Sequence, residues 1–194
     1  MKRSGCLFIL SGPSGSGKTT LRQEILKRFP NMVYSVSYTT RKPREKEQSG
    51  RDYCFITEVA FKTGIESGEW IEWAQVYGNY YGTSAVFLDR ELSRGRDVLL
   101  DIDIQGTRQI LRKFKECIPI FIMPPSLDVL RERLEKRGSE IGASLERRLD
   151  DARTEITQIQ MYRHVVINDR LEEAVSELTD LIQGYRTRCK NLCL

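Results

Sequence analysis

Residues 12–19 of the chain read Gly12-Pro13-Ser14-Gly15-Ser16-Gly17-Lys18-Thr19, which fits the pattern G-x-x-x-x-G-K-[ST]. The apolar segment Cys6 to Leu10 directly precedes this stretch, and a helical pattern that includes Leu21 and Ile25 follows it. Glycines let successive backbone N–H groups turn toward a polyphosphate, and the start of the next helix adds its positive end. The stretch therefore predicts a phosphate-binding loop between a strand and a helix.

The alternation of a short apolar run with a helical pattern recurs along the rest of the chain. Further candidates for buried strands are Val98 to Ile102, Ile118 to Met123 and His164 to Ile167. Such alternation is typical of parallel βαβ units. With 194 residues, the chain is long enough for one full-sized domain. The prediction is an α/β fold, in which a P-loop NTPase-like core has a parallel sheet flanked by helices.

Two interruptions of this pattern predict appendages to the core. Strand-like alternation in Val33 to Val36 and in Trp70 to Trp73, with a turn signal at Gly78-Asn79, predicts a small antiparallel insertion that makes the α/β fold locally mixed. A second interruption, Gly138 to Ser144, separates two charged helical segments and predicts a helical lid. The predicted single domain has a core of residues 1–33, 84–125 and 160–194, an insertion of about 34–83 and a lid of about 126–159.

Composition excludes several classes of function. The 31 basic and 27 acidic residues leave a net charge of +4, which is too small an excess for a nucleic-acid-binding protein. No apolar stretch approaches the roughly 18 residues of a membrane span, and no signal-peptide pattern is present. The five cysteines are odd in number and lack C-x-x-C spacing, which favours reduced thiols. We therefore expect a cytoplasmic protein without a membrane or nucleic-acid partner.

A phosphate-binding loop alone is compatible with kinases, GTPases, ATPases and motors. The run Val98 to Asp101 is typical of a buried strand that ends in a carboxylate, where an Asp associated with Mg²⁺ is expected. The hydroxyl of Thr19 and the carboxylate of Asp101 are therefore the predicted metal ligands. Alternatively, Asp101 caps a helix that starts near Gln105. The chain has no Asn-Lys-x-Asp segment, which argues against a GTPase.

A second anion site is indicated by two arginines around a proline. Arg41 and Arg44 flank Pro43 in a segment that cannot be a regular helix, and guanidinium groups match phosphate oxygens in pairs. Tyr53 could add a phenolic hydrogen bond. Two phosphate sites would imply transfer between two nucleotides. The alternative is a solvated charged loop, since nearby acidic residues, including Glu47, offset much of the charge.

Taken together, these stretches resemble the guanylate kinases. Besides the phosphate-binding loop, the stretches behind the resemblance are Ser35 to Arg44, Gly50 to Phe55, Ile71 to Gln75, Gly78 to Gly82, Leu100 to Gly106, Pro124 to Ser126, Leu134 to Gly138 and Val166 to Asp169. They follow the family's order over most of the chain. Lys46 replaces a glycine that is frequent in the family, Thr83 replaces a serine, and the tail from Cys189 to Leu194 matches nothing.

The resemblance implies ATP-dependent phosphorylation of GMP, and also of dGMP, to supply guanine nucleotides and recycle GMP. Mg²⁺ bound with ATP is the implied cofactor, ATP and GMP are the partners, and the chain is expected to be a monomer or a homodimer. The implied ATP-binding residues are Gly12, Pro13, Ser14, Gly15, Ser16, Gly17, Lys18, Thr19, Thr20 and Asn168. The implied GMP-binding residues are Ser37, Arg41, Arg44, Tyr53, Glu72, Tyr81, Thr83 and Asp103. The implied catalytic residues are Lys18, Arg41, Arg133, Arg137 and Arg148.

Glu72 is the residue expected to recognise the base, because a carboxylate accepts hydrogen bonds from the N1–H and 2-amino group of guanine. Adenine lacks this pair of donors. The alternation around Ile71 and Trp73 fits an exposed strand carboxylate equally well. The lid arginines Arg133 and Arg137 could instead pair with glutamates of their own helix.

Two other functions fit part of the pattern. A guanylate-kinase-like binding module would use the GMP-site surface to hold phosphorylated protein segments, but such modules lose the phosphate-binding loop. Another P-loop kinase would act on a different small phosphorylated substrate and would need no residue to recognise guanine. Glu72 and Ser37 argue against this alternative, because both are expected to contact guanine. Because Arg147 and Arg148 are adjacent, the sequence does not decide which of the two is the third lid arginine.

Overall fold

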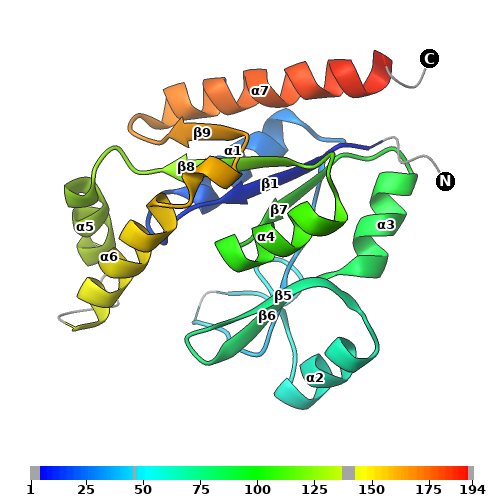
Figure 1. Ribbon diagram of the computed structural model, residues 1–194, viewed down its shortest axis with the longest axis horizontal. Coiled ribbons are helices and arrows are strands. Elements are labelled where there is room, and N and C mark those ends of the chain that lie inside the picture. The colour runs from blue at the N-terminus through cyan, green and yellow to red at the C-terminus, as the bar shows by residue number, and fades with distance from the viewer. Residues whose placement is uncertain (1–4, 46, 137–142, 192–194) are drawn as a thin grey trace. The chain divides into compact units, whose positions relative to one another are not determined.

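The computed structural model describes residues 5–45, 47–136 and 143–191 (Figure 1). In chain order its elements are β1 (Leu7–Ser11), α1 (Lys18–Arg28), β2 (Val33–Tyr34), β3 (Tyr38–Thr39), β4 (Cys54–Phe55), α2 (Glu58–Glu66), β5 (Trp70–Val76), β6 (Asn79–Ser84), α3 (Ala85–Ser93), β7 (Val98–Asp101), α4 (Ile104–Lys113), β8 (Ile118–Met123), α5 (Leu127–Lys136), α6 (Ala143–Ile156), η1 (Ile159–Met161), β9 (His164–Ile167) and α7 (Leu171–Asn191).

The chain divides into two compact units, each formed from two stretches of sequence. The first unit comprises Met1–Phe8 and Asn31–Cys117, and the second comprises Ile9–Pro30 and Ile118–Leu194. Strand β1 contributes its first two residues to the first unit and its last three to the second. The predicted division into core, insertion and lid follows other boundaries and stays a prediction.

In the first unit, β2 pairs with β7 in parallel, with Val33 opposite Val98 and Tyr34 opposite Leu99. This corrects the prediction that the alternation from Val33 to Val36 belongs to an antiparallel insertion. Alternation shows that a segment is extended, but the choice of partner strand depends on residues far away in the sequence. The predicted strand from Val98 is confirmed as β7 and has a buried apolar run.

The second sheet of the first unit has the strand order β4-β3-β6-β5. Strands β5 and β6 pair antiparallel, and β3 pairs antiparallel with β6 but parallel with β4, so the sheet is mixed. Tyr77 and Gly78 both have positive φ, of 47° and 79°, at the predicted turn between β5 and β6. Aromatic rings pack against this sheet, where Phe61 of α2 stacks on Trp70 with ring centroids 4.7 Å apart.

The second unit contains the predicted phosphate-binding loop and the strand order β1-β8-β9. Strands β8 and β9 pair in parallel, with Ile120 opposite His164. Helices α1 and α7 lie side by side, and the guanidinium of Arg186 lies 5.3 Å from the ring centroid of Phe29 (Figure 1). Together with the helices of the first unit, this arrangement confirms the predicted α/β fold with a parallel sheet and flanking helices.

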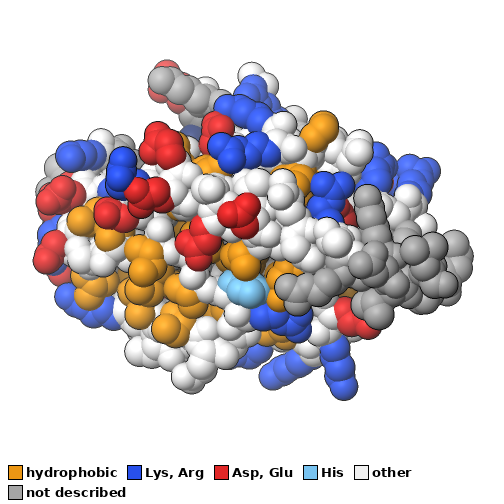
Figure 2. All heavy atoms as spheres, turned by 90° about the horizontal axis from the view of Figure 1, so that it is seen from above, with side chains coloured by type: hydrophobic (Ala, Val, Ile, Leu, Met, Phe, Trp, Pro, Cys, Tyr) orange, Lys and Arg blue, Asp and Glu red, His pale blue; other side chains and the backbone are white. Residues whose placement is uncertain are grey.

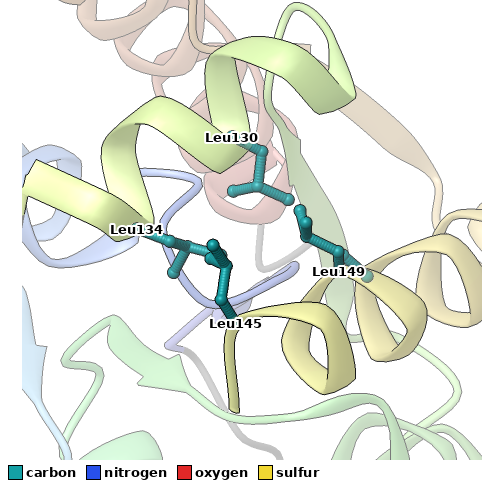
Figure 3. Packing of buried hydrophobic residues seen from close by; sticks show 5 residues of the cluster. Leu130, Leu134, Leu145 and Leu149 are labelled. Carbon is teal, nitrogen blue, oxygen red and sulfur yellow. The ribbon is translucent and has the colours of Figure 1, made fainter. Parts of the chain in front are cut away.

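Helices α5 and α6 of the second unit pack through a cluster of leucines (Figure 3). Leu130 and Leu134 of α5 point toward Leu145 and Leu149 of α6, and all four are less than 9% exposed. Because both helices bury apolar side chains against each other, they form a joined pair rather than two separate solvated helices. Arg131 and Glu146 form an ion pair at 2.6 Å across the exposed side of the pair.

On the face shown in Figure 2, lysine and arginine side chains are interspersed with acidic ones. The single histidine, His164, lies on this face (pale blue), and its Nε2 is 2.8 Å from the hydroxyl of Tyr185. Within the described residues, no helix is both long enough and apolar enough to cross a lipid bilayer.

Candidate nucleotide-binding sites

The phosphate-binding loop of the second unit lies where the sequence predicts it, between β1 and α1. Gly17 precedes α1 with φ of 93°, a conformation that glycine adopts readily and other residues rarely do. The Nζ of Lys18 donates hydrogen bonds to the carbonyl oxygens of Gly12 at 2.5 Å and Pro13 at 3.1 Å. The ammonium group is therefore held against the backbone of the loop that the sequence predicts to hold phosphates.

Asn168 fixes this loop from the end of β9. Its amide Nδ2 donates to the carbonyl oxygen of Ser16 at 2.8 Å, and the residue is 6% exposed. A Cβ atom at position 17 would lie 2.1 Å from the same Nδ2. Gly17 is therefore required for space as well as for its backbone conformation. Asn168, expected to bind ATP, contacts the loop itself.

Two of the expected lid arginines also reach this region. Arg133 of α5 donates through Nη2 to the carbonyl oxygen of Asn168 at 2.9 Å, and its Nη1 is buried with no hydrogen-bond partner in the described part of the chain. Arg148 of α6 donates through Nη1 to the hydroxyl of Ser14 at 3.3 Å. Of the pair Arg147 and Arg148, the second thus contacts the loop. Arg137 lies outside the described residues.

A cavity of about 320 Å³ opens beside the loop. Two loop glycines, the start of α1, two side chains of α5 and the segment after β9 line it, namely Gly15, Gly17, Thr20, Arg133, Lys136, Asn168, Asp169 and Leu171. The cavity brings together Gly15, Gly17, Thr20 and Asn168 of the predicted ATP site with Arg133 of the predicted lid. Leucines of α5 are also close, since a Cβ at position 15 would lie 2.9 Å from Cδ1 of Leu130.

In the first unit, Glu72 of β5 is buried. Its side chain shares the inner face of the strand with Trp70 and Ala74, and the residue is 4% exposed. The hydroxyl of Thr83 on β6 donates to Oε1 of Glu72 at 2.5 Å. The alternative that Glu72 is an exposed strand carboxylate is therefore wrong.

Burial raises the pKa of Glu72 to about 7, although the hydrogen bond from Thr83 acts in the opposite direction. The negative charge of Asp103 raises this pKa further, and the charge of Lys113 lowers it. Near neutral pH this carboxyl group can therefore exist as an acceptor or as a protonated donor. A pKa matched to the working pH is typical of residues in functional sites.

Two further predicted GMP-site residues lie near Glu72. Because Tyr38 is opposite Gly82 in an antiparallel pair, Ser37 precedes β3 at the position opposite Thr83, and Ser37 is 5% exposed. Asp103 caps α4, and its Oδ1 accepts a hydrogen bond from the N–H of Gly106 at 2.8 Å. The alternative that Asp101 caps this helix is wrong, because Asp103 occupies the cap position. Asp101 ends β7 and is half-buried.

Arg41 is the centre of an aromatic and charged cluster in the same unit. Its guanidinium carbon lies 5.3 Å from the ring centroid of Tyr53, and the rings of Tyr53 and Tyr81 meet edge to face at 5.8 Å. Its Nη2 donates to both carboxylate oxygens of Glu47, at 2.8 and 2.9 Å. Three predicted phosphate-site residues, Arg41, Tyr53 and Tyr81, are thus brought together.

Glu47 is a component of this cluster that the sequence indicated only as an offsetting charge. Its Oε2 also accepts a hydrogen bond from the backbone N–H of Arg44 at 2.8 Å. Burial acts to raise the pKa of Glu47, but the hydrogen bonds and charges of Arg41 and Arg44 outweigh it and lower that pKa. One carboxylate therefore holds both the guanidinium of Arg41 and the backbone of Arg44, which differs from a solvated loop of independent charges.

Three α4 residues without a role predicted from the sequence contact β5 around Glu72. They are Gly106, Gln109 and Lys113. Gly106 ends a stretch that matches the family, but no motif includes Gln109 or Lys113, and an amide or a lysine in a helix indicates no role until the neighbouring strand is known. The spacing of i, i+3 and i+7 is typical of any helix face and indicates nothing about its partner.

Comparison with known proteins agrees with this geometry. The family model described as guanylate kinase matches residues 4–185. The guanylate kinase of Geobacter metallireducens is 46% identical over 188 residues, which cover 97% of this chain and 93% of that protein. The guanylate kinase of Thermotoga maritima is 42% identical over 184 residues, with 95% and 89% covered. A crystal structure of guanylate kinase from Anaplasma phagocytophilum matches with a TM-score of 0.80 and 33% identity, covering 95% of this chain and 88% of that one.

Proposed function

The chain belongs to the guanylate kinase family, so it transfers the γ-phosphoryl group of ATP to GMP to give ADP and GDP, and we propose which residues perform each part of this reaction. We include dGMP as an acceptor and guanine nucleotide supply, with recycling of GMP, as the role. Retention of the phosphate-binding loop with Lys18 supports an enzyme rather than a binding module.

The observation behind the proposal is the buried carboxylate of Glu72. A carboxylate that is 4% exposed and held by Thr83 has a fixed orientation, and its ionised form only accepts hydrogen bonds. Guanine presents two adjacent donors, the N1–H and the 2-amino group, whereas adenine presents an unprotonated N1 at the matching edge. With AMP the buried carboxylate would keep only the hydrogen bond from Thr83, and a buried acceptor that lacks its other partners costs about 1–3 kcal/mol or more.

We propose that the Arg41 cluster holds the phosphate of GMP. Arg41 and Arg44 supply positive charge, and Tyr53 and Tyr81 supply phenolic hydrogen bonds beside it. Ser37, Thr83 and Asp103 complete the acceptor site around Glu72. Base and phosphate would thus be recognised by separate groups of side chains in one unit of the chain.

We propose that the loop from Gly12 to Thr19 and Thr20 bind the phosphates of ATP. The cavity of about 320 Å³ beside the loop offers space for part of the nucleotide, with Asn168 at its wall. The orphaned Nη1 of Arg133 supports an anionic ligand here, because a buried guanidinium nitrogen without a partner is costly. A phosphate oxygen would be a suitable acceptor.

The metal of the reaction is proposed to be Mg²⁺ held with ATP by Thr19 and Asp101. Thr19 lies exposed in the first turn of α1, and Asp101 ends β7. A hydroxyl and a carboxylate are hard oxygen ligands, which suit Mg²⁺, and this ion commonly takes only one or two protein ligands beside phosphates. When bound, it neutralises the charge of the β- and γ-phosphates.

Phosphoryl transfer requires no nucleophilic side chain. It needs the attacking and leaving oxygens in line, water kept out and the charge on the moving group neutralised. We propose Lys18, Arg41, Arg133, Arg137 and Arg148 for this role. Arg148 contacts Ser14 of the donor loop, and Arg133 contacts the backbone of Asn168, whose side chain in turn donates to Ser16 of that loop.

We place the reaction in the cytoplasm. Cys6, Cys54 and Cys117 form no disulfide in the described part of the chain, and this suits a reducing compartment.

An assay of ADP release with GMP, dGMP, AMP, UMP and CMP tests the proposal. We expect GMP and dGMP to be the efficient acceptors, with kcat/KM for AMP at least about 100-fold lower. Comparable rates with AMP, or with a pyrimidine nucleotide, would refute the acceptor assignment.

A further inference from the structure

Helix α4 is hydrogen-bonded to β5, the strand that contains Glu72. β5 is the edge of its sheet in the described residues, with β6 on one side. On its other side, the amide of Gln109 accepts from the N–H of Trp73 at 3.2 Å and donates to the Trp73 carbonyl at 2.6 Å. The Nζ of Lys113 donates to the carbonyl of Ile71 at 2.5 Å. Both neighbours of Glu72 in the chain are therefore bound to α4.

Gly106 brings the same helix against the carboxylate itself. A Cβ atom at this position would lie 2.3 Å from Oε2 and 3.0 Å from Cδ of Glu72. Glycine is a poor residue for the interior of a helix, and the first turn of α4 needs no positive φ at this position. The requirement for glycine here is therefore one of space.

We propose that Gly106, Gln109 and Lys113, the positioning face of α4, hold the Glu72 carboxylate where guanine can reach it. The three residues act on selectivity through Glu72 and are positioning residues. Asp103 fixes the start of the helix by capping it, so α4 is anchored at its N-terminus as well as along β5. The inference rests on the proposed function of Glu72 as the residue that recognises the base.

The contact itself is tested without any nucleotide, by a double-mutant cycle. Gly106→Ala should lower the melting temperature when Glu72 is present, because the added methyl group meets the carboxylate. In the Glu72→Asp background the carboxylate is one methylene shorter, so the same substitution should leave the melting temperature unchanged or raise it, since alanine favours helix. Equal changes in both backgrounds would overturn the positioning role.

Steady-state kinetics then test its consequence for selectivity. Gly106→Ala should raise KM for GMP about tenfold or more and narrow the ratio of kcat/KM between GMP and AMP, because a carboxylate displaced by about 1 Å no longer fits both donors. The KM for ATP and the kcat should stay within about twofold. Gln109→Ala should act in the same direction. Arg112→Ala, exposed on the same helix, is the matched control and should resemble the unmodified enzyme.

The kinetics of a further variant, Glu72→Gln, together with these two experiments, separate the possible failures. If Glu72→Gln leaves the GMP-to-AMP ratio unchanged, the proposed function of Glu72 fails, whatever the melting temperatures show. If Glu72→Gln narrows the ratio but either the melting-temperature changes are equal in the two backgrounds or Gly106→Ala leaves KM for GMP unaltered, Glu72 recognises guanine without help from α4. That second result overturns the inference alone.

Discussion

Thr83 and Glu72 face each other on paired strands, and the Thr83 hydroxyl donates to Oε1 of the carboxylate at 2.5 Å while Oε2 lies toward Gly106. The carboxylate is thereby restrained by two elements of one compact unit, β6 and α4. A restrained, buried acceptor recognises a donor pair by geometry, since little conformational entropy is lost on binding. Its burial also has consequences for pH that can be measured.

Without nucleotide, the buried Glu72 is predicted to make the protein less stable as the pH rises from about 4.5 to about 7. Its pKa is raised from 4.5 to about 7 in the folded protein, so the folded state binds more protons in this range. The stabilisation that protonated Glu72 gives the folded protein is complete below about pH 4.5, its pKa in the unfolded chain. It is lost as the pH rises through about 7, its pKa in the folded protein. The shift corresponds to about 3 kcal/mol in the free energy of unfolding.

Chemical denaturation of the wild type and of Glu72→Gln at pH 5 and pH 8 measures this effect. Gln cannot ionise and keeps an oxygen for Thr83, so its stability relative to the wild type should increase toward pH 8. A difference between the two proteins that does not change with pH would contradict the predicted titration.

The affinity for GMP is predicted to fall below pH 7, because a protonated Glu72 donates where guanine requires an acceptor. The dissociation constant should rise about tenfold for each pH unit below the pKa of Glu72. The phosphate of GMP also titrates near pH 6. The control is calorimetry with Glu72→Gln, because the phosphate of GMP still titrates in that experiment whereas residue 72 does not. Parallel profiles for the two proteins would count against a role for Glu72 in binding.

Removal of the Arg41 guanidinium is predicted to weaken the use of GMP much more than that of ATP. Arg41→Ala loses the positive charge beside Tyr53 and leaves the Glu47 carboxylate to repel the incoming phosphate. The kcat/KM for GMP should fall about 100-fold, while KM for ATP stays within about twofold.

Two further variants sharpen this prediction. Arg51→Ala removes an exposed arginine of the same segment and should have little effect. Arg41→Ala combined with Glu47→Gln should recover part of the loss, because the repelling charge is gone. An equal loss in Arg51→Ala would mean that the general charge of the segment matters and not the cluster around Arg41.

Gly17→Ala is predicted to impair ATP binding for a reason that Gly68→Ala lacks. Both glycines have positive φ, of 93° and 72°, so alanine costs about 1–2 kcal/mol in backbone strain at either. A Cβ at position 17 also displaces Asn168 from Ser16, whereas one at position 68 meets nothing within 4 Å. KM for ATP should rise about tenfold or more only in Gly17→Ala. Equal KM values in the two variants would remove the proposed role of Asn168.

Local patterns predicted the phosphate-binding loop and the major strands because glycine spacing and hydrophobic runs report on nearby backbone. The family motifs then indicated the acceptor residues. The depth of Glu72 could not be predicted, since alternation around Ile71 and Trp73 fits either face of β5. The partner of β2 was also hidden, because pairing with β7 joins residues some 65 positions apart.

Contacts made by residues outside any motif could not be predicted from the sequence either. Asp101 and Asp103 both precede α4, and only the backbone path shows that Asp103 is the cap. Gln109 resembles any helix residue until the edge of β5 lies beside it. Side chains that satisfy a neighbouring backbone have no periodicity of their own, so their roles follow from tertiary structure alone.

The most direct test of the account is a structure of the protein with GMP bound. The guanine N1 and 2-amino nitrogens are predicted to lie within about 3 Å of the carboxylate oxygens of Glu72, with the phosphate at Arg41. A base bound elsewhere, with Glu72 still contacting only Thr83 and α4, would contradict it.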